Sequence, residues 1–261
     1  MLWMTLAGLA LAIAAIASGQ VIEGASLGIL FQPGALLIVA GGTFGAVVAQ
    51  STPRDFGTAV SLLGWLVRPP SGREEDTVGE IVKWARMAQK KGALELDALA
   101  ANSRDSLLKN GLEMVVDNYG ANQIRETLMT GVKVRDARLR NAVKVWESAG
   151  GYAPTIGILG SVLGLLHVMG ALTDPSKLGP GIAMAFVATL YGLGLANMVL
   201  LPLASKFKAM LFELTLRDEM RVEGLAMIAE TKKPHVIERS LKAFAQQGGN
   251  AVESPRLRRV A

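Results

Sequence analysis

The chain contains no cysteine and only two histidines, His167 and His235. Without cysteine there are no disulfides, thiolate metal ligands or cysteine nucleophiles, and two histidines are too few for a histidine-based metal centre. No arrangement of serine, histidine and acid is apparent, and the Gly-Gly-Thr segment at 41–43 lacks the lysine of a phosphate-binding loop. We therefore expect a protein that is not an enzyme and that has no cofactor or metal.

Charged residues are missing from four long stretches, which are residues 1–22, 25–53, 149–173 and 178–205. A helix needs about 20 apolar residues to cross a bilayer, and a charge at that depth costs roughly 3 kcal/mol. The sequence therefore predicts an all-α membrane protein with four transmembrane helices. Because these stretches contain no carboxylate, an ion carried past them would need its titratable group on another chain.

The four stretches suggest a division of the chain into four parts. Residues 1–53 would form transmembrane helices 1 and 2, residues 54–148 a large helical insert, residues 149–205 transmembrane helices 3 and 4, and residues 206–261 amphipathic helices with a basic tail. The insert and the C-terminal part should be the soluble regions of the molecule, because they contain nearly all of its charge.

Basic residues are distributed unevenly between the connections. The insert has 15 Lys and Arg residues and the C-terminal part has 11, whereas the short connections contain only Glu23 or Asp174 with Lys177. The positive-inside rule then predicts a multi-pass protein of the cytoplasmic (inner) membrane with both termini in the cytoplasm. We expect contact with membrane lipid but not with nucleic acid, because 13 acidic residues alternate with the basic residues of the insert.

Apolar residues recur at helical spacing through the insert. Thr77, three residues ahead of Glu80, would cap a first helix as in a capping box, and Gly92 would end it. Ser103 would cap a second helix, and a third helix over residues 121–148 would continue toward the third uncharged stretch. The segment after the fourth stretch also has the pattern of a long amphipathic helix.

Small residues and two prolines mark the third and fourth stretches. The glycines of the third stretch are Gly150, Gly151, Gly157, Gly160, Gly164 and Gly170. Small residues at such spacings let membrane helices approach closely, which indicates a bundle or an oligomer. Pro154 and Pro202 either kink their helices and free backbone carbonyls or simply lie near helix ends.

Several uncharged polar side chains lie in the same stretches. They are Thr43, Ser161, Thr189, Tyr191 and Asn197. Each either hydrogen-bonds within its own bundle, which is the commoner fate of a membrane Ser or Thr, or lines a wet path for an ion. His167 either relays protons or lies near an interface.

Three segments resemble the flagellar stator A subunit, the MotA/PomA family of the MotA/TolQ/ExbB proton channel superfamily. Residues 153–208 (APTIGILGSVLGLLHVMG onward) resemble its third and fourth membrane segments, residues 30–48 (LFQPGALLIVAGGTFGAVV) its second, and residues 88–102 (AQKKGALELDALAAN) its cytoplasmic torque region. Their order and spacing correspond over nearly the whole chain except the C-terminal tail.

The resemblance implies a stator subunit of the bacterial flagellar motor, which converts ion-motive force into torque on the rotor and serves motility and chemotaxis. Five A subunits would surround two copies of a MotB/PomB-type B subunit, whose single membrane helix carries the essential aspartate. Pro154 and Pro202 match the family's two coupling prolines. Ser161 and Thr189 fall where sodium-driven members place hydroxyls near the ion, and Thr43 and Tyr191 are further candidates for the ion pathway.

The resemblance also implies contact with a rotor switch protein of the FliG type. Asp97 stands at the family's acidic position for this contact, whereas its basic position falls on Gln89. The adjacent Lys90 and Lys91 are therefore the candidates for the basic contact.

Gln32 and Ser161 resemble the residues of proton-driven members, so we expect the translocated ion to be H⁺ rather than Na⁺. A TolQ/ExbB-type energy-transducing subunit is the alternative, but its members have three membrane spans. A secondary transporter would show more spans, internal repeats or a charged site at mid-membrane. If the stator interpretation holds, this chain alone conducts no ions, because the acid that carries them belongs to the partner.

Overall fold

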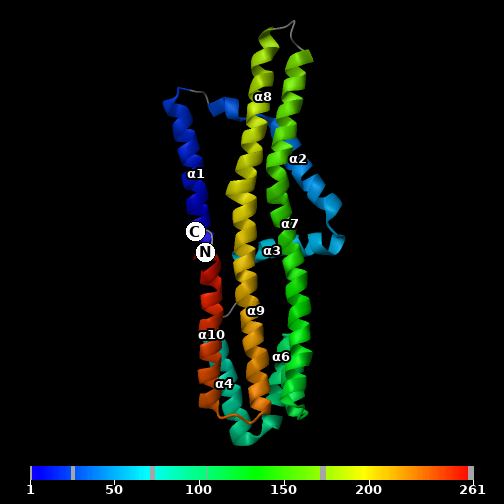
Figure 1. The fold of residues 1–261 in the computed structure, drawn as a ribbon, viewed down its shortest axis with the longest axis vertical. Coiled ribbons are helices and arrows are strands. Elements are labelled where there is room, and N and C mark those ends of the chain that lie inside the picture. Colours follow the sequence, from blue (N-terminus) through cyan, green and yellow to red (C-terminus); the bar gives the residue numbers. More distant parts are fainter. Residues whose placement is uncertain (1, 25–26, 71–73, 104, 171–174, 258–261) are drawn as a thin grey trace. The chain divides into compact units, whose positions relative to one another are not determined.

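A computed structural model describes residues 2–24, 27–70, 74–103, 105–170 and 175–257 of the chain (Figure 1). These residues form helices and no strand, which confirms the predicted all-α class. The helices are α1 (Leu2–Ile22), η1 (Leu27–Leu30), α2 (Pro33–Gln50), α3 (Pro53–Val67), α4 (Glu74–Lys91), η2 (Ala93–Leu96), α5 (Asp97–Asn102), α6 (Ser106–Val116), α7 (Ala121–Gly170), α8 (Pro175–Gly194), η3 (Leu195–Leu200), α9 (Leu201–Ala229) and α10 (Pro234–Leu257).

The chain divides into two compact units. The apolar unit consists of Met1–Pro69 and Leu139–Ala209, and the charged unit consists of Pro70–Arg138 and Met210–Ala261. Both α7 and α9 contribute residues to each unit. The predicted continuation of the third insert helix into the third uncharged stretch is confirmed, since α7 runs without a break over 50 residues.

Three helical stretches of the described chain are long and apolar enough to cross a membrane. They are Gly28–Gln50, Ala121–Gly170 and Leu178–Ala229, whereas the N-terminal helix contributes a shorter apolar stretch, Ala7–Ile22. The described residues therefore support three spans, and the fourth remains a prediction. Residues 171–173 of the third stretch and Asp174 of the predicted connection lie outside the part that the structure describes.

Inside the apolar unit, α2 packs against α8 through Ala35, Val39 and Ala188, which are fully buried. The buried residues of α2 recur every four positions, so they form one face of that helix. After α2, Thr52 caps α3 by accepting a hydrogen bond from the Asp55 N–H at 3.1 Å.

Trp146 holds α3 against α7 in the same unit. The Trp146 indole N–H donates to the Ala59 carbonyl oxygen at 3.0 Å, and its ring lies 6.1 Å from the Phe207 ring of α9. Trp146 is half-buried, and an indole N–H removed from water usually finds such an acceptor, so this contact helps to position α3.

In the charged unit, α4, α6, α7, α9 and α10 share one apolar core. Its members with no more than 1% exposure include Ile81, Leu112, Ile124, Leu225 and Ile237. The core packs closely, because a Cβ added to Gly224 would stand 2.5 Å from the Ile81 side chain. The apolar residues that predicted the helices of the insert are thus buried in this core.

Two of the predicted helix caps are wrong. Thr77 lies within α4 and is 2% exposed, because the described helix begins earlier, at Glu74. The second insert helix is capped by Asp105, whose carboxylate accepts from the Leu107 N–H at 3.0 Å, while the Ser103 hydroxyl only donates to the Asp105 carbonyl oxygen. Gly92 does end α4, as predicted, in the left-handed conformation at φ 90° that favours glycine.

A buried ion network links α4, α6, α7 and α9 within the charged unit. The Asp218 carboxylate is 1% exposed and pairs with Arg135 of α7 and with Arg221 of its own helix. Arg221 also pairs with Asp105 at 3.2 Å and with Glu80 at 3.8 Å. Because a buried carboxylate requires partners, Asp218 joins four elements through its two arginines.

Candidate functional site

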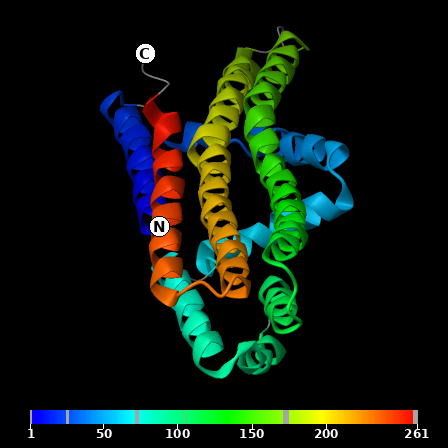
Figure 2. The same cartoon turned by 60° about the horizontal axis from the view of Figure 1, so that its bottom comes forward.

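The helices α7 and α8 lie side by side in both views (Figures 1 and 2) and approach to backbone contact. A Cβ on Gly157 would stand 3.0 Å from the Ala188 carbonyl oxygen, and one on Gly164 would stand 2.9 Å from the Ala185 Cα. These glycines belong to the small-residue pattern noted in the sequence. They allow the close contact by which membrane helices associate.

On α7, Ser161 lies on the flank of this contact that α2 leaves uncovered. A Cβ on Gly160 would stand 3.4 Å from Ile38 of α2, so α2 covers the Gly160 side. Gly160 follows Gly157 by three residues and Ser161 follows it by four, and these two spacings lie on opposite sides of a helical contact line. Ser161 is half-buried there, and Pro154, seven residues earlier, lies on the same side.

The same reasoning places Thr189 on that flank. Ala185 of α8 faces Gly164, and Ala188, three residues later, packs against α2. Thr189 follows Ala185 by four residues, so it lies on the opposite side and is also half-buried. The uncovered flank of α7 and α8, with Pro154, Ser161 and Thr189, is called the open flank below.

The two prolines lie at neighbouring levels of the facing helices. Pro154 has no N–H, which deprives the Gly150 carbonyl oxygen of its usual helical partner. A Cβ on Gly150 would stand 2.5 Å from the Leu201 side chain, and Pro202 is the next residue after Leu201. The structure therefore brings together two backbone irregularities that lie far apart in the sequence.

Pro202 follows a turn of π-helix, η3, that sequence analysis missed. This turn separates α8 from α9, and π-helical turns are rare insertions that often occur at functional sites. Within it, the Asn197 amide donates to the Leu193 carbonyl oxygen at 3.0 Å. That hydrogen bond gives Asn197 the ordinary role of satisfying its own helix.

Tyr191 and Thr43 lie elsewhere, at the contact between α2 and α8. The Tyr191 hydroxyl donates to the Leu30 carbonyl oxygen and accepts from the Gln32 N–H at 3.2 Å. It therefore holds the chain that enters α2. Thr43 is fully buried on α2, and its hydroxyl has no hydrogen-bond partner in the described part of the chain. The structure thus separates these two candidates from Ser161 and Thr189.

His167 lies in the last turn of α7, where its side chain is exposed. The described contacts give it no hydrogen bond or ion pair. No described residue therefore forms a hydrogen bond or ion pair with His167 that would support either a proton relay or an interface role.

The second candidate surface is the tip of the charged unit between α4 and α5. Lys90 and Lys91 occupy the last turn of α4, Asp97 begins α5, and all three are exposed. Lys91 pairs with Glu95 at 2.6 Å, whereas no ion pair within the described ranges involves Lys90 or Asp97. Lys90 and Asp97 are therefore available to a charged partner.

Leu94 is a residue of this tip that sequence analysis missed. Its side chain is 78% exposed, between the predicted basic and acidic contacts. A single exposed leucine is common, but one that stands between available charges can serve as an apolar anchor. Its exposure depends on the turn at Gly92, so the apolar pattern alone could not reveal it.

Comparison with known proteins gives two family matches. Residues 6–92 match the family described as motility protein A N-terminal, and residues 100–220 match the MotA/TolQ/ExbB proton channel family. Together these regions contain Ser161, Thr189, Lys90 and Lys91, whereas Leu94 and Asp97 lie in the gap between the two matches.

Relatives and solved structures extend over nearly the whole chain. Motility protein A of Bacillus subtilis is 33% identical over 92% of this chain and 89% of its own length, and chemotaxis protein PomA of Vibrio alginolyticus is 30% identical over 88% and 90%. The flagellar MotAB stator complex of Bacillus subtilis matches 90% of this chain and 93% of its own with a TM-score of 0.80 and 33% identity. The C. jejuni MotAB structure, at 24% identity, has the same fold with a TM-score of 0.87 over 94% of this chain and 96% of its own.

Proposed function

The chain belongs to the motility protein A family of MotA/TolQ/ExbB proton channels, and from this membership we propose how it works as a stator subunit of the bacterial flagellar motor. It is a membrane protein that forms an ion channel with a MotB-type subunit, and it is not an enzyme. The resemblance noted in residues 30–48, 88–102 and 153–208 is thereby confirmed. Five copies of the chain would surround two B subunits, with both termini in the cytoplasm.

The open flank of α7 and α8 would face the membrane helix of the B subunit. The observation that carries this proposal is that Ser161 and Thr189 share this flank, while the uncharged stretches contain no carboxylate. The ion would bind to an acid of the B subunit, and the two hydroxyls would offer it oxygen contacts as it passes. We restrict the pathway to these two residues, because the Tyr191 hydroxyl is occupied by Leu30 and Gln32 and Thr43 is fully buried on α2.

Pro154 and Pro202 would couple ion passage to movement. Their helices contact at Gly150 and Leu201, and each proline removes a backbone hydrogen bond that would otherwise stiffen its helix. A change in the charge of the B-subunit acid would shift the preferred packing of this region. Repeated changes of this packing, one for each ion, would then turn the ring of A subunits around the B subunits. An elementary charge that crosses about 100 mV releases roughly 2.3 kcal/mol.

The α4–α5 tip would transmit this movement to a rotor switch protein of the FliG type. Lys90 and Asp97 are exposed and available for charged contacts, whereas Lys91 already pairs with Glu95. We therefore assign the basic contact to Lys90 first. Leu94 would add an apolar contact between the two charges.

The alternative function is a TolQ/ExbB-type transducer, because these proteins belong to the same channel family. The match of residues 6–92 to the motility protein A N-terminal region favours the stator, because that match covers most of α1 and all of α2, α3 and α4. The neighbouring reading frame supplies a further test. A partner with one N-terminal membrane helix that bears an aspartate and then a peptidoglycan-binding domain is expected.

The function and the coupling ion can be tested together in a non-motile strain that lacks both stator genes. Production of the chain with its B subunit should restore swimming, and production of either alone should not. With H⁺ as the ion, a protonophore should stop the cells, while removal of external sodium at fixed pH should leave their speed unchanged. Speed that follows sodium and resists the protonophore would contradict proton coupling but leave the stator function intact.

A further inference from the structure

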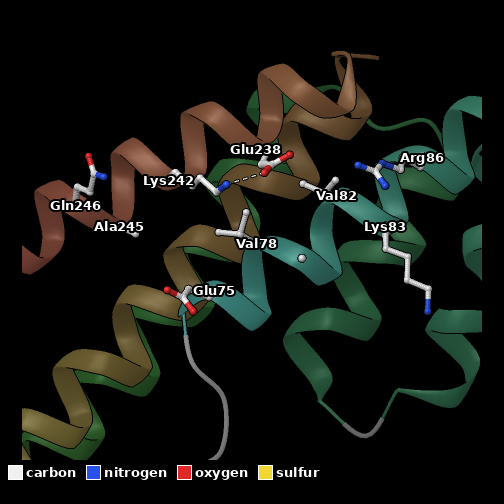
Figure 3. A pocket seen from close by; sticks show the side chains of 10 residues that line it. Glu75, Val78, Val82, Lys83, Arg86, Glu238, Lys242, Ala245 and Gln246 are labelled. Carbon is white, nitrogen blue, oxygen red and sulfur yellow. Dashed lines mark hydrogen bonds and ion pairs between the residues drawn. The ribbon is translucent and has the colours of Figure 1, made fainter.

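A groove of about 740 Å³ runs between α4 and α10 in the charged unit (Figure 3). One wall is α4 from Glu75 to Arg86, and the other is α10 from Glu238 to Gln246. On each wall the lining residues are mostly three or four positions apart, so each wall is formed by one face of its helix. The α4 stripe is about 16 Å long at 1.5 Å per residue. We call this feature the α4–α10 groove.

The centre of the α4–α10 groove is apolar and open. Val78 and Val82 are 5% and 6% exposed, and Ala245 lines the opposite wall. Between the two valines lies Gly79, where an added Cβ would meet nothing within 4 Å. The absence of a side chain at Gly79 therefore leaves space above the apolar floor that another helix can enter.

The rim of the groove has an excess of positive charge along one side. Lys242 donates to the Glu238 carboxylate at 2.7 Å and so neutralises it (Figure 3). Lys83 and Arg86 remain, and no ion pair within the described ranges involves either of them. Glu75 stands at the other end of the α4 wall, more than two turns from Lys83. Arg86 adds a weaker electrostatic attraction to Glu238. With Lys83, Arg86 and Lys242 against Glu75 and Glu238, the rim has a net excess of positive charge beside an apolar floor.

We propose that the α4–α10 groove binds an acidic amphipathic helix of a partner protein. A helix laid in a groove between two helices contacts it through apolar residues at spacings of three and four, which fits a floor built from Val78, Gly79 and Val82. Acidic residues on the flank of that helix complement Lys83 and Arg86. Complementary charges of this kind select the partner and its orientation.

The proposal goes beyond the stator function derived above. It involves neither the B-subunit acid nor Lys90 and Asp97 of the α4–α5 tip. Loss of swimming in a tip variant therefore says nothing about the groove, and failure of the groove test leaves the stator function unaffected.

A binding experiment tests the proposal with the purified complex of the full chain and its B subunit in detergent. The probe is a fluorescent synthetic helical peptide with leucine and alanine on one side and glutamate on both flanks, measured by anisotropy. A peptide of the same composition in scrambled order is the control for charge alone. We expect the amphipathic peptide to bind and the scrambled peptide to bind at least about tenfold more weakly.

Variants locate the binding site. Lys83→Gln with Arg86→Gln should weaken binding about tenfold, because both complementary charges are removed. The matched control, Lys109→Gln with Lys133→Gln, removes the same charge elsewhere in the unit and should change binding less than about twofold. Gly79→Trp fills the groove without a change in charge and should also weaken binding, while the circular dichroism and melting temperature of each variant report its folding.

A second copy of this chain is the competing occupant. Because the chain contains no cysteine, Gly79→Cys can carry a maleimide benzophenone as its one attached photocrosslinker. Crosslinking between two copies of the chain after illumination would overturn the proposal, as would equal binding of the scrambled peptide or full binding by the Lys83→Gln, Arg86→Gln variant. Absence of a copy-to-copy product, together with the charge and filling effects, is the expected result.

Discussion

Gly192 of α8 lies against Ala153 of α7 so closely that a Cβ at position 192 would stand 2.5 Å from the Ala153 carbonyl oxygen. The Ala153 carbonyl oxygen belongs to the backbone, so it cannot move away by a side-chain rotation. Gly157 lies on the same line, since its own Cβ would stand 3.1 Å from the Gly192 Cα. The distance between α7 and α8, and with it the open flank, therefore depends on the absence of side chains here.

Replacement of Gly192 by alanine should push α7 and α8 apart. The methyl group would meet the Ala153 carbonyl oxygen, and overpacking of this kind costs about 1–3 kcal/mol. We expect a lower melting temperature of the purified complex and reduced swimming. Gly151→Ala on α7 is the matched control, because nothing lies within 4 Å of its added Cβ. Equal effects of the two substitutions would show that the helix contact does not limit stability.

The membrane helices could be predicted from the sequence because their signal is local. Long runs without charge cover α2, the C-terminal part of α7 and most of α8. The end of α8 at Gly194 lies inside the fourth uncharged stretch and was not predicted. The glycines that pack α7 on α8 were also recognisable, since small residues at spacings of three and four have few other uses in lipid. Sequence alone did not decide which flank faces outward, because that depends on where α2 lies.

Other features depend on contacts between distant residues. Tyr191 was a reasonable candidate for the ion pathway by position, but its hydroxyl contacts Gln32, which is 159 residues away in the chain. The Thr77 cap failed because α4 already begins at Glu74, three residues before the local capping signal, and Thr77 is buried within that helix. The π-helical turn η3 has no composition that distinguishes it from an α-helix. None of these three features is encoded in a local sequence pattern of the kind used for the prediction.

Asp218 should be the most sensitive charged residue of the charged unit. Asp218→Asn would remove the carboxylate that pairs with Arg135 and one of the three that pair with Arg221. Breaking one side of a buried ion pair costs about 3 kcal/mol. A clear fall in the melting temperature of the purified complex is expected. Glu80→Gln is the control, since its carboxylate is 52% exposed and lies 3.8 Å from Arg221. If both variants melt alike, the burial of Asp218 contributes nothing to stability.

The α4–α5 tip should control torque without a role in assembly. Lys90→Glu combined with Asp97→Lys reverses both available charges and should slow the rotation of tethered cells, while the amount of complex in the membrane stays unchanged. Leu94→Asp should have a similar effect, since it replaces the exposed apolar side chain. Lys109→Glu on α6 serves as a control outside the tip. Normal rotation in the double variant would remove these residues from the rotor contact.

Acid should weaken the contact between Arg125 of α7 and Glu230, the residue that follows α9. A hydrogen bond from Lys232 at 2.6 Å and another from Arg125 at 2.8 Å lower the pKa of Glu230 below its usual 4.5. A lowered pKa in the folded state means that the stabilisation is complete above the unfolded-state pKa of about 4.5 and is lost as the pH falls through the folded-state value.

The variant Glu230→Gln tests this pH dependence. It should melt at a lower temperature than the wild type at neutral pH, and the difference should shrink as the pH falls below about 4.5. Glu113→Gln, which disturbs only an exposed pair at 4.0 Å, should show little difference at either pH. A difference that stays constant with pH would mean that Glu230 acts through packing rather than charge.

Removal of the hydroxyl groups on the open flank should have a different effect from removal of the buried hydroxyl of α2. Thr189→Val and Ser161→Ala take oxygen atoms from the open flank, so both should slow swimming several-fold if an ion passes there, with normal amounts of complex in the membrane. Thr43→Val removes a buried hydroxyl that has no partner in the described part of the chain. Replacing an unsatisfied buried hydroxyl by a methyl group of the same shape is neutral or stabilising, so this variant should swim normally and melt no lower than the wild type. Slow swimming in Thr43→Val with normal speed in Thr189→Val would move the ion pathway to the contact between α2 and α8.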